Sequence, residues 1–208
     1  MTVAPITIEP MQAKYNPQIS RLIVHGFRGK FQKLVNKNDD ELALFFEKLF
    51  DHFPTEPASQ RMVALQEGEV IGTISIKWKP ESDMNQKQGL PPLKSFDRFG
   101  KWSLFKMLLG LHLLDHKPQA GVCYIADIVV HPDHRSKGVG KLLLQWAQHF
   151  AQTETHLDTL SLHVVGSNPR AKHLYELLSF QTQSQHNSFV RHLLFKEPKW
   201  YYMVLKSK

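Results

Sequence analysis

The stretch from Tyr124 to Phe150 constrains the fold of this 208-residue chain most, because it reads as a strand, a tight basic turn and a helix. The strand is predicted from an apolar run that ends near Pro132, which cannot donate the backbone N–H that a sheet ladder needs. The helix is predicted from apolar side chains at helical spacing, namely Leu142, Leu143, Trp146, Ala147 and Phe150. Free backbone N–H groups and the positive end of the helix dipole converge at such a turn, so the sequence predicts an anion site.

The turn itself has the sequence Arg135-Ser136-Lys137-Gly138-Val139-Gly140. A Walker loop is excluded, because Arg135 stands where its first glycine is needed and Leu142 where its hydroxyl is needed. The dinucleotide fingerprint is excluded as well, because its third glycine would fall at Leu143. What remains is Arg-x-x-Gly-x-Gly after a strand, which resembles the coenzyme A loop of the GNAT N-acetyltransferase family. The alternative is an ordinary strand–helix connection that contains two glycines.

A second segment, residues 168–180, resembles the other GNAT signature, Asn-x-x-Ala-x-x-Leu-Tyr-Glu-x-x-Gly-Phe. It follows a strand-like stretch, Thr159 to Val165, in the order that the family requires. One departure is Ser179, which occupies the position of a glycine that ends the helix in a left-handed conformation. The two motifs together extend the resemblance over roughly residues 60–206.

The resemblance implies an α/β (α+β) fold, in which helices flank a mixed, mostly antiparallel sheet of about six to seven strands. We expect a single GNAT acetyltransferase domain over residues 1–208, with an insertion at about 79–120. Apolar periodicity and turn residues predict the remaining elements. The expected strands are 6–8, 62–65, 70–78, 188–195 and 200–205, and the expected helices are 16–27 and 39–50.

The insertion contains an apolar segment, Phe99 to Leu114, which we expect to form a helix packed on its own domain. Gly110 lies inside this segment and weakens the helix prediction. Three alternatives stay open: a helix lying on a membrane surface, a dimer contact, or a lid over the acceptor.

The resemblance also implies an activity, the transfer of an acetyl group from acetyl-CoA to an amine of a small molecule, peptide or protein by direct attack in a ternary complex. The pyrophosphate of acetyl-CoA would be held by the turn and the helix N-terminus, and the pantetheine arm would pair with the preceding strand. The second motif would contact the same arm. The cofactor-binding residues implied are Ile128, Val129, Val130, Arg135, Ser136, Lys137, Gly138, Val139, Gly140, Lys141, Asn168, Ala171 and Tyr175.

Two residues are candidates for catalysis. Tyr175 occupies the position of the family's general acid, which protonates the leaving thiolate; the alternative is a tyrosine that only packs at helical spacing. Asp127 is the best candidate for the base, because Ala126 stands where many members carry the first carboxylate of a pair. Strand alternation leaves open whether Asp127 points toward the site. His131, His163, Glu67 and a chain of waters are further options.

Composition bears on partners and location. The net charge of +7 fits nucleic acid, a membrane surface or a polyanionic ligand such as coenzyme A, and we expect no nucleic acid because no recognition motif is present. Cys123 is the single cysteine, so no intrachain disulfide forms, and we expect a buried thiol. The twelve histidines are scattered, so no metal site is expected. The absence of a signal-like start and of a spanning apolar run favours a cytoplasmic protein.

Two other functions stay open at this stage: an acyl-CoA-binding regulatory module without turnover, and an acyltransferase associated with a membrane surface. A homodimer is common in the family and is neither required nor excluded by the sequence. The acceptor and the preferred length of the acyl chain are not indicated by any motif.

Overall fold

The computed structural model describes residues 4–53, 58–80, 93–187, 192 and 195–206. Seven strands form one sheet in the order β1-β2-β3-β4-β5-β7-β6. The strands are β1 (Thr7–Pro10), β2 (Ser59–Gln66), β3 (Glu69–Lys77), β4 (Val122–Val130), β5 (Thr159–Val165), β6 (Gln181–Asn187) and β7 (Lys199–Lys206). The α-helices are α1 (Asn16–Leu34), α2 (Asp39–His52), α3 (Lys101–Leu114), α4 (Val139–Thr153) and α5 (Pro169–Leu177), and the short 3-10 helices are η1 (Ala13–Tyr15), η2 (Leu93–Phe99) and η3 (Pro132–His134).

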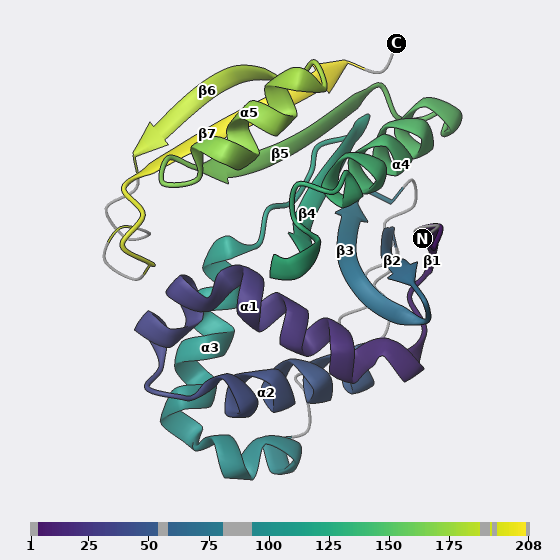
Figure 1. The fold of residues 1–208 in the computed structure, drawn as a ribbon. Coiled ribbons are helices and arrows are strands. Elements are labelled where there is room, and N and C mark those ends of the chain that lie inside the picture. Colours follow the sequence, from purple (N-terminus) through teal and green to yellow (C-terminus); the bar gives the residue numbers. More distant parts are fainter. Residues whose placement is uncertain (1–3, 54–57, 81–92, 188–191, 193–194, 207–208) are drawn as a thin grey trace.

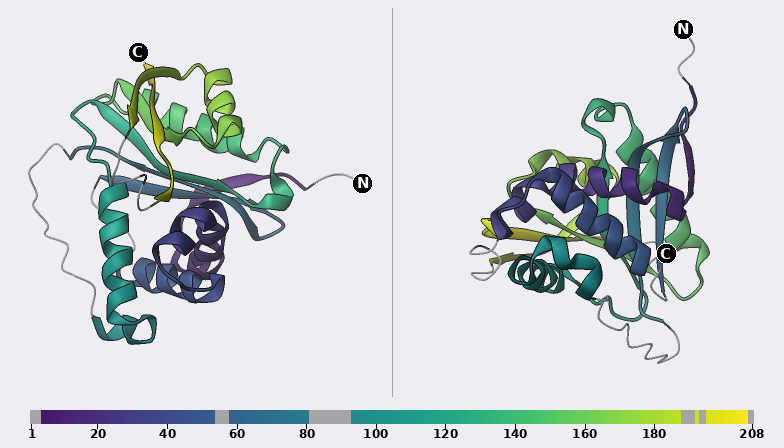
Figure 2. Two further views of the ribbon diagram at one scale, coloured as in Figure 1. Left: turned by 90° about the vertical axis from the view of Figure 1, so that its left-hand side faces the viewer. Right: turned by 90° about the horizontal axis from the view of Figure 1, so that it is seen from below.

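Helices cover both faces of the sheet (Figure 1). Helices α1, α2 and α3 lie on one face, and α4 and α5 lie on the other, as the left view of Figure 2 shows. Each face has its own hydrophobic core: Phe45, Phe46 and Val63 belong to the first, and Leu143, Ala147 and Leu162 to the second. The sheet therefore separates two layers, and a residue on a strand faces one or the other by alternation.

All strand pairs of the sheet are antiparallel except β4 and β5, which are parallel. The expected α/β fold with a mixed, mostly antiparallel sheet is confirmed. The pairing of β4 with β5 covers Val122 to Ile125 and stops at the pair Ile125–Leu162, although both strands continue. The two strands consequently diverge beyond this pair (Figure 1).

Local signals explain several helix boundaries. Helix α2 begins with a capping box, in which Asn38 and Glu41 exchange side-chain-to-backbone hydrogen bonds of 2.9 and 3.0 Å. Helix α1 is longer than expected and kinks at Phe27, where φ and ψ are −117° and 16°. Ser179 departs from the glycine of the motif, and it nevertheless adopts the left-handed conformation, with φ of 67°.

The strand expected at 188–195 lies mostly outside the described residues. Its two described members, His192 and Phe195, are helical. The strand that precedes β7 is instead β6, Gln181–Asn187, an edge strand whose residues are largely exposed. Its polar side chains show no apolar alternation, which is why patterning favours the apolar residues that follow it.

The apolar segment of residues 101–114 forms helix α3, which packs against α1 and η2. Leu104 and Met107 are buried, and Gly110 lies against Leu34 of α1, so close that a Cβ would be 2.3 Å from a Leu34 methyl. This contact explains a glycine inside the helix. Trp102, Phe105 and Leu109 on the outer side are 67%, 54% and 41% exposed. Within the described part of the chain, no helix is long and apolar enough to cross a membrane.

Cys123 is fully buried on β4, as expected. Burial raises the pKa of its thiol to about 12, because the thiolate would lose its hydration. A thiol with such a pKa is a poor nucleophile at neutral pH, which supports a structural role.

Candidate active site

The turn between β4 and α4 presents unpaired backbone donors. Gly138 precedes the helix with φ of 85°, a left-handed conformation that glycine adopts without steric cost. The first backbone bond of helix α4 runs from Leu142 N to Gly138 O at 3.0 Å, so the N–H groups of residues 139–141 have no acceptor within the helix. No acidic residue lies in the first turn of α4. This end of α4 therefore has the donors and the potential that a phosphate group requires.

Side chains brace the turn from two directions. Arg135 Nε donates to Val130 O at 3.2 Å, which ties the turn to the end of β4. Arg170 of α5 donates to the Ser136 hydroxyl, which ties the turn to the second motif. Ser136 has φ of 63°, and Lys137 and Lys141 are exposed beside the turn. The two sequence motifs thus meet in space at the predicted anion site.

Strand β4 carries a bulge next to the divergence from β5. Ser75 of β3 pairs with Asp127 and Ile76 pairs with Ile125, so Ala126 is the extra residue on β4. Beyond this bulge, β4 no longer pairs with β5, and among the described residues no other strand pairs with that edge of β4 at Asp127 and Ile128. A ligand with amide groups fits such a gap as an added strand.

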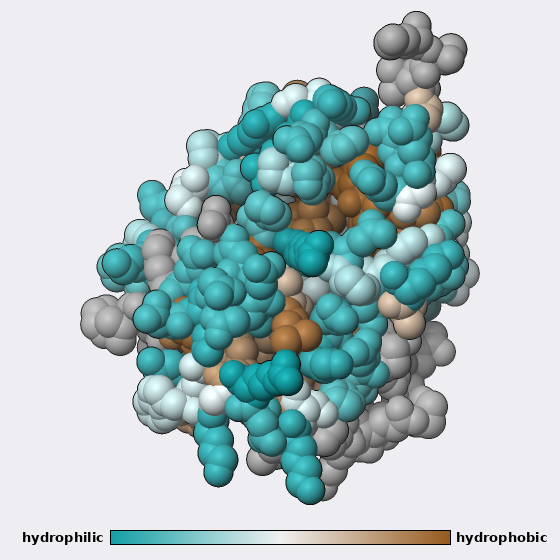
Figure 3. Space-filling model, turned by 60° about the horizontal axis from the view of Figure 1, so that its bottom comes forward, coloured by the Kyte–Doolittle hydropathy of each residue, from teal (hydrophilic) through white to brown (hydrophobic). Residues whose placement is uncertain are grey.

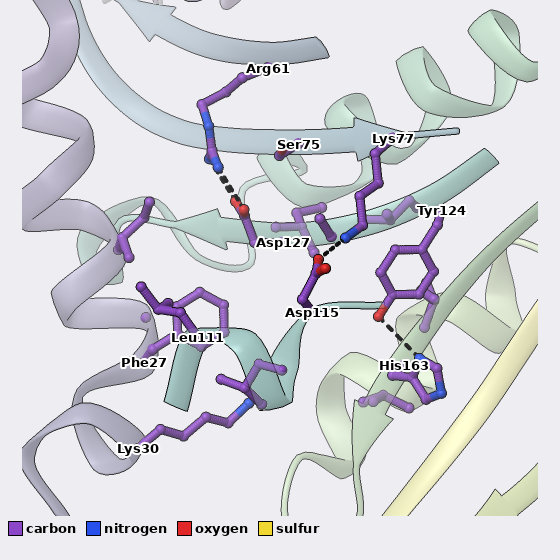
Figure 4. Close-up of a pocket in the computed structure, with 18 of the residues that line it drawn as sticks. Phe27, Lys30, Arg61, Ser75, Lys77, Leu111, Asp115, Tyr124, Asp127 and His163 are labelled. Carbon is purple, nitrogen blue, oxygen red and sulfur yellow. Dashed lines mark hydrogen bonds and ion pairs between the residues drawn. The ribbon is translucent and has the colours of Figure 1, made fainter. Parts of the chain in front are cut away.

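A cavity of about 580 Å³ extends from the gap between β4 and β5 to the layer formed by α1, α2 and α3. Ile128, Asn168, Ala171 and Tyr175 line its end at the strand gap. The remainder is lined by apolar side chains of α1, α2 and α3, with Phe27 and Leu111 labelled in Figure 4, together with charged and polar side chains. In Figure 3, hydrophobic surface is recessed between hydrophilic side chains on the lower face of the molecule.

Tyr175 projects from α5 and is 7% exposed. It lines the cavity, and its ring lies 6.0 Å from that of Phe180. Burial raises the pKa of its phenol to about 12, because the phenolate would be desolvated. Among the described residues, nothing hydrogen-bonds its hydroxyl in this structure. Tyr175 is thus a protonated phenol at neutral pH whose hydroxyl has bonding capacity left for a ligand.

Asn168 caps helix α5, where its Oδ1 accepts from Ala171 N at 3.1 Å. Its side-chain amide nitrogen keeps its donor capacity, and the residue lines the cavity. Both interpretations of Asn168, a helix cap and a ligand contact, are therefore compatible with one conformation.

Asp127 faces the cavity, but it is already engaged. Its two carboxylate oxygens accept from Nη1 and Nη2 of Arg61, both at 2.7 Å, and the two side chains are only 17% and 15% exposed. Arg61 lies on β2 directly across β3 from Asp127, because both residues pair with Ser75. The pair also places the guanidinium 5.3 Å from the centre of the Phe50 ring. Asp127 therefore has an evident structural role.

The other residues considered for the base lie in three places. His163 faces the cavity on β5, and its Nδ1 is 3.0 Å from the Tyr124 hydroxyl of β4 (Figure 4). His131 lies after β4, with its ring 6.2 Å from that of His25, and Glu67 lies in the turn between β2 and β3. Of these three residues, His163 is the one that the described cavity lining contains.

The remaining candidates on β4 have side chains that pack elsewhere. A Cβ on Gly26 of α1 would lie 2.6 Å from Val129, so Val129 holds α1 against the sheet. Val130 lies near Gly140 at the start of α4. Neither observation bears on their backbone groups, through which we expect these residues to act.

Sequence reasoning missed several side chains that line the cavity, namely Lys30, Arg61, Ser75, Lys77, Asp115 and Tyr124. Lys77 forms an ion pair with Asp115 and lies over the Tyr124 ring. The sequence did contain a signal for some of them: Arg61 and Lys77 are lone charged residues within or beside apolar strands. In the described part of the chain, no cluster of three or more His, Cys, Asp or Glu side chains has the geometry of a metal site.

The chain matches the model of the Acetyltransferase (GNAT) family over residues 28–180. It is 31% identical over 83 residues to a mycothiol acetyltransferase of Tsukamurella paurometabola, which covers 39% of this chain and 28% of that protein. It is 38% identical over 54 residues to a spermidine N(1)-acetyltransferase of Vibrio cholerae serotype O1, which covers 26% of this chain and 31% of that protein. The matches span less than a third of either relative.

Solved structures extend the similarity to nearly the whole chain. A spermidine N-acetyltransferase chimera from Vibrio cholerae superposes with a TM-score of 0.59 at 16% identity, covering 97% of this chain and 96% of that one. An acetyltransferase from Thermus thermophilus superposes with a TM-score of 0.56 at 14% identity, covering 99% of each chain. At these identities the likeness shows the fold.

Proposed function

We propose that this chain, which belongs to the acetyltransferase (GNAT) family, transfers an acetyl group from acetyl-CoA to an amine by direct attack in a ternary complex. One observation carries the proposal: the part of β4 that no longer pairs with β5 borders the cavity under α1 to α3 at Asp127 and Ile128 and leads along the chain to the N-terminus of α4. A donor bound along this part of β4 would therefore bring its reactive end to the cavity, where an acceptor can meet it.

The residues of the turn and of β4 would bind the donor. Backbone N–H groups from Ser136 to Lys141 would hold the pyrophosphate, since the N–H of Arg135 already donates to Pro132 O at 3.2 Å. The side chains of Arg135, Lys137 and Lys141 would add charge. The backbone of Ile128, Val129 and Val130 would pair with the pantetheine amides, because β4 has lost its partner there. One N–H of this strand would polarise the thioester carbonyl, a contribution of about 3–4 kcal/mol per donor in other enzymes. Asn168 and Ala171 would contact the same arm.

Tyr175 would protonate the leaving thiolate. Its raised pKa keeps the phenol protonated at neutral pH, and its position in the cavity lining places it beside the strand gap. A thiolate with a pKa near ~8.5 is a weaker base than a phenolate of pKa ~12, so the transfer depends on proximity and on the low polarity of the site.

The proton of the attacking amine needs an acceptor, and two candidates face the cavity. Asp127 stays a prediction, but using it as a base means taking a proton onto a carboxylate that Arg61 holds in a bidentate pair. The Tyr124–His163 hydrogen bond offers a second route. The Tyr124 oxygen would accept the amine proton as its own proton passes to His163 Nδ1, which leaves a neutral phenol and an imidazolium. His163 also borders a second hollow, through which the proton could leave.

The two alternatives from the sequence are less well supported. Retention of Tyr175 in the cavity lining favours turnover over a regulatory module without activity. A membrane-surface enzyme would rest on the exposed residues of α3, but the other side of that helix packs on α1. A cytoplasmic location, acetyl-CoA and an amine as partners, and a single domain with an insertion at 79–120 complete the proposal.

The test is amine-dependent release of CoA thiol from acetyl-CoA, with the acetylated product identified by mass spectrometry. A panel of primary amines, each assayed with and without protein, should contain at least one that gives product. Binding of acetyl-CoA without turnover of any amine in a broad panel would favour the regulatory module instead.

A further inference from the structure

Two side chains form a hydrogen bond where strands β4 and β5 begin to diverge. The Tyr124 hydroxyl of β4 lies 3.0 Å from Nδ1 of His163 on β5. The pairing of the two strands ends at Ile125 and Leu162, one residue beyond Tyr124 and one residue before His163. The Tyr124–His163 pair therefore lies at the start of the strand gap, where the proposed donor would bring its thioester to the cavity.

His116 packs against both members of this pair. Its ring centre lies 4.5 Å from that of Tyr124 and 5.1 Å from that of His163. The ring of Tyr202, the β7 partner of His163, has its centre 4.9 Å from that of His163 and 6.0 Å from that of His116. Tyr124 is 5% exposed, and the other three residues are partly buried. The four packed rings consequently limit one another's rotation.

An ion pair fixes the segment that carries His116. Asp115, the residue that follows helix α3, pairs with Lys77 of β3. The ammonium of Lys77 lies 5.7 Å from the centre of the Tyr124 ring, and Figure 4 shows the ion pair beside this ring. The end of α3 is thereby tied to the sheet next to Tyr124, and His116 is the next residue of the chain. The segment that we expect to be an insertion therefore reaches the proposed site of the chemistry.

Proton transfer from Tyr124 to His163 depends on the alignment of their two side chains. A hydrogen bond weakens steeply as its angle bends. Nδ1 of His163 accepts the Tyr124 proton only in the tautomer that carries hydrogen on Nε2, with the ring turned so that Nδ1 faces the hydroxyl. The imidazolium so formed would lose one proton to water in the second hollow, which His116 and His163 both line. A His163 ring that turns freely would interrupt this route.

We infer that His116 is a positioning residue: its ring holds Tyr124 and His163 in the alignment that carries the proton of the acceptor amine away. The inference rests on the proposed acetyl transfer and on the Tyr124–His163 route for its base. It gives the end of α3 a part in the reaction in addition to the lining of the cavity.

Nitrogen NMR of the imidazole rings tests the positioning without an acceptor. The signals of His163 are identified by their loss in His163→Gln. We expect His163 to carry its hydrogen on Nε2 in the wild type and in His116→Phe, which keeps a ring at this position. In His116→Ala we expect a mixture of both tautomers, because the ring of His163 has lost a neighbour. The same single tautomer in all three proteins would contradict the inference.

Steady-state kinetics with 2-phenylethylamine, ethanolamine and spermidine separate positioning from binding. With each of these amines that the wild type acetylates, His116→Ala should lower kcat by about tenfold and leave KM for acetyl-CoA within about twofold, because misalignment affects the chemical step. His116→Phe should keep kcat within about threefold of the wild type, since it restores the ring contacts. Equal losses in the two variants would contradict the inference.

A double-variant cycle asks whether His116 acts through His163. Because removal of His163 already interrupts the route, His116→Ala should lower kcat no further in the His163→Gln background. A second loss of about tenfold in that background would show an independent effect and overturn the inference. His149→Ala, the same change at an exposed position on α4, is the matched control and should keep the wild-type kcat. Absence of turnover by the wild type with these and all other amines of the panel would overturn the proposed function, and the inference with it.

Discussion

The two ends of the active-site cavity are built in different ways. The donor end uses backbone groups of one continuous stretch, residues 124–180, in which a bulge, a strand gap and a helix N-terminus follow one another. The acceptor end uses side chains from α1, α2, α3 and the strands of the sheet, which are far apart in the chain. Backbone recognition requires a short local pattern, whereas side-chain recognition requires the whole fold. The donor is therefore readable from sequence and the acceptor is not.

The largest effect is expected at the donor end, from Tyr175→Phe. Loss of the phenol proton should lower kcat by about 10²–10⁴-fold, the usual contribution of a positioned acid, with little change in KM for acetyl-CoA. Steady-state kinetics measure both. Tyr201→Phe on β7 is the control, since Tyr201 is not among the described residues that line the cavity. A kcat close to that of the wild type would remove the acid role of Tyr175.

At the boundary between the two ends, His163→Gln should lower kcat by about 10²-fold. The activity that remains should no longer decline as the pH falls. The sign follows from the role, because a base works only when unprotonated and so fails as the pH falls.

Asp127→Asn should instead leave the pH profile intact and lower the free energy of unfolding by about 2–3 kcal/mol, since Arg61 loses its charged partner.

His149→Gln, at an exposed position on α4, is the control for the histidine change. The opposite outcome, a lost acid limb in Asp127→Asn with an unaltered profile in His163→Gln, would assign the base to Asp127.

At the acceptor end, Gly26→Ala should destabilise the protein by about 1–2 kcal/mol. The new Cβ would lie 2.6 and 2.8 Å from the methyl groups of Val129, a stiff β-branched side chain, so α1 must move away from β4. At about 2–4 °C per kcal/mol, the melting temperature should fall by a few degrees. In the double variant Gly26→Ala, Val129→Ala, relief of the clash should restore part of the loss. An undiminished melting temperature in Gly26→Ala would show that this contact does not hold α1 in place.

The smallest effect is expected from Lys137→Ala at the donor end. Lys137 is exposed in the turn, and exposed charges contribute little when water and salt screen them. We expect the Kd for acetyl-CoA to rise by less than about threefold at physiological salt, as isothermal titration calorimetry can measure. A rise of about tenfold would mean that side-chain charge, rather than the backbone of the turn, dominates phosphate binding.

The same contrast explains what could be predicted from the sequence. The turn, α5 and the left-handed Ser179 were found because their residues lie together and each carries a backbone requirement. Arg61 could not be assigned to Asp127, because the two are 66 residues apart and meet only through the register of β2, β3 and β4. The edge strand β6 was missed because its polar residues are exposed and carry no apolar alternation.

The most direct test of the central claim is thermal unfolding with acetyl-CoA, with free CoA and ATP as controls. A ligand at about 100 times its Kd stabilises the folded protein by ~2.7 kcal/mol, which at this size raises the melting temperature by several degrees. We predict such a rise with acetyl-CoA and with CoA but not with ATP. The absence of any rise at millimolar acetyl-CoA would contradict the account of the strand gap and the helix N-terminus as a working donor site.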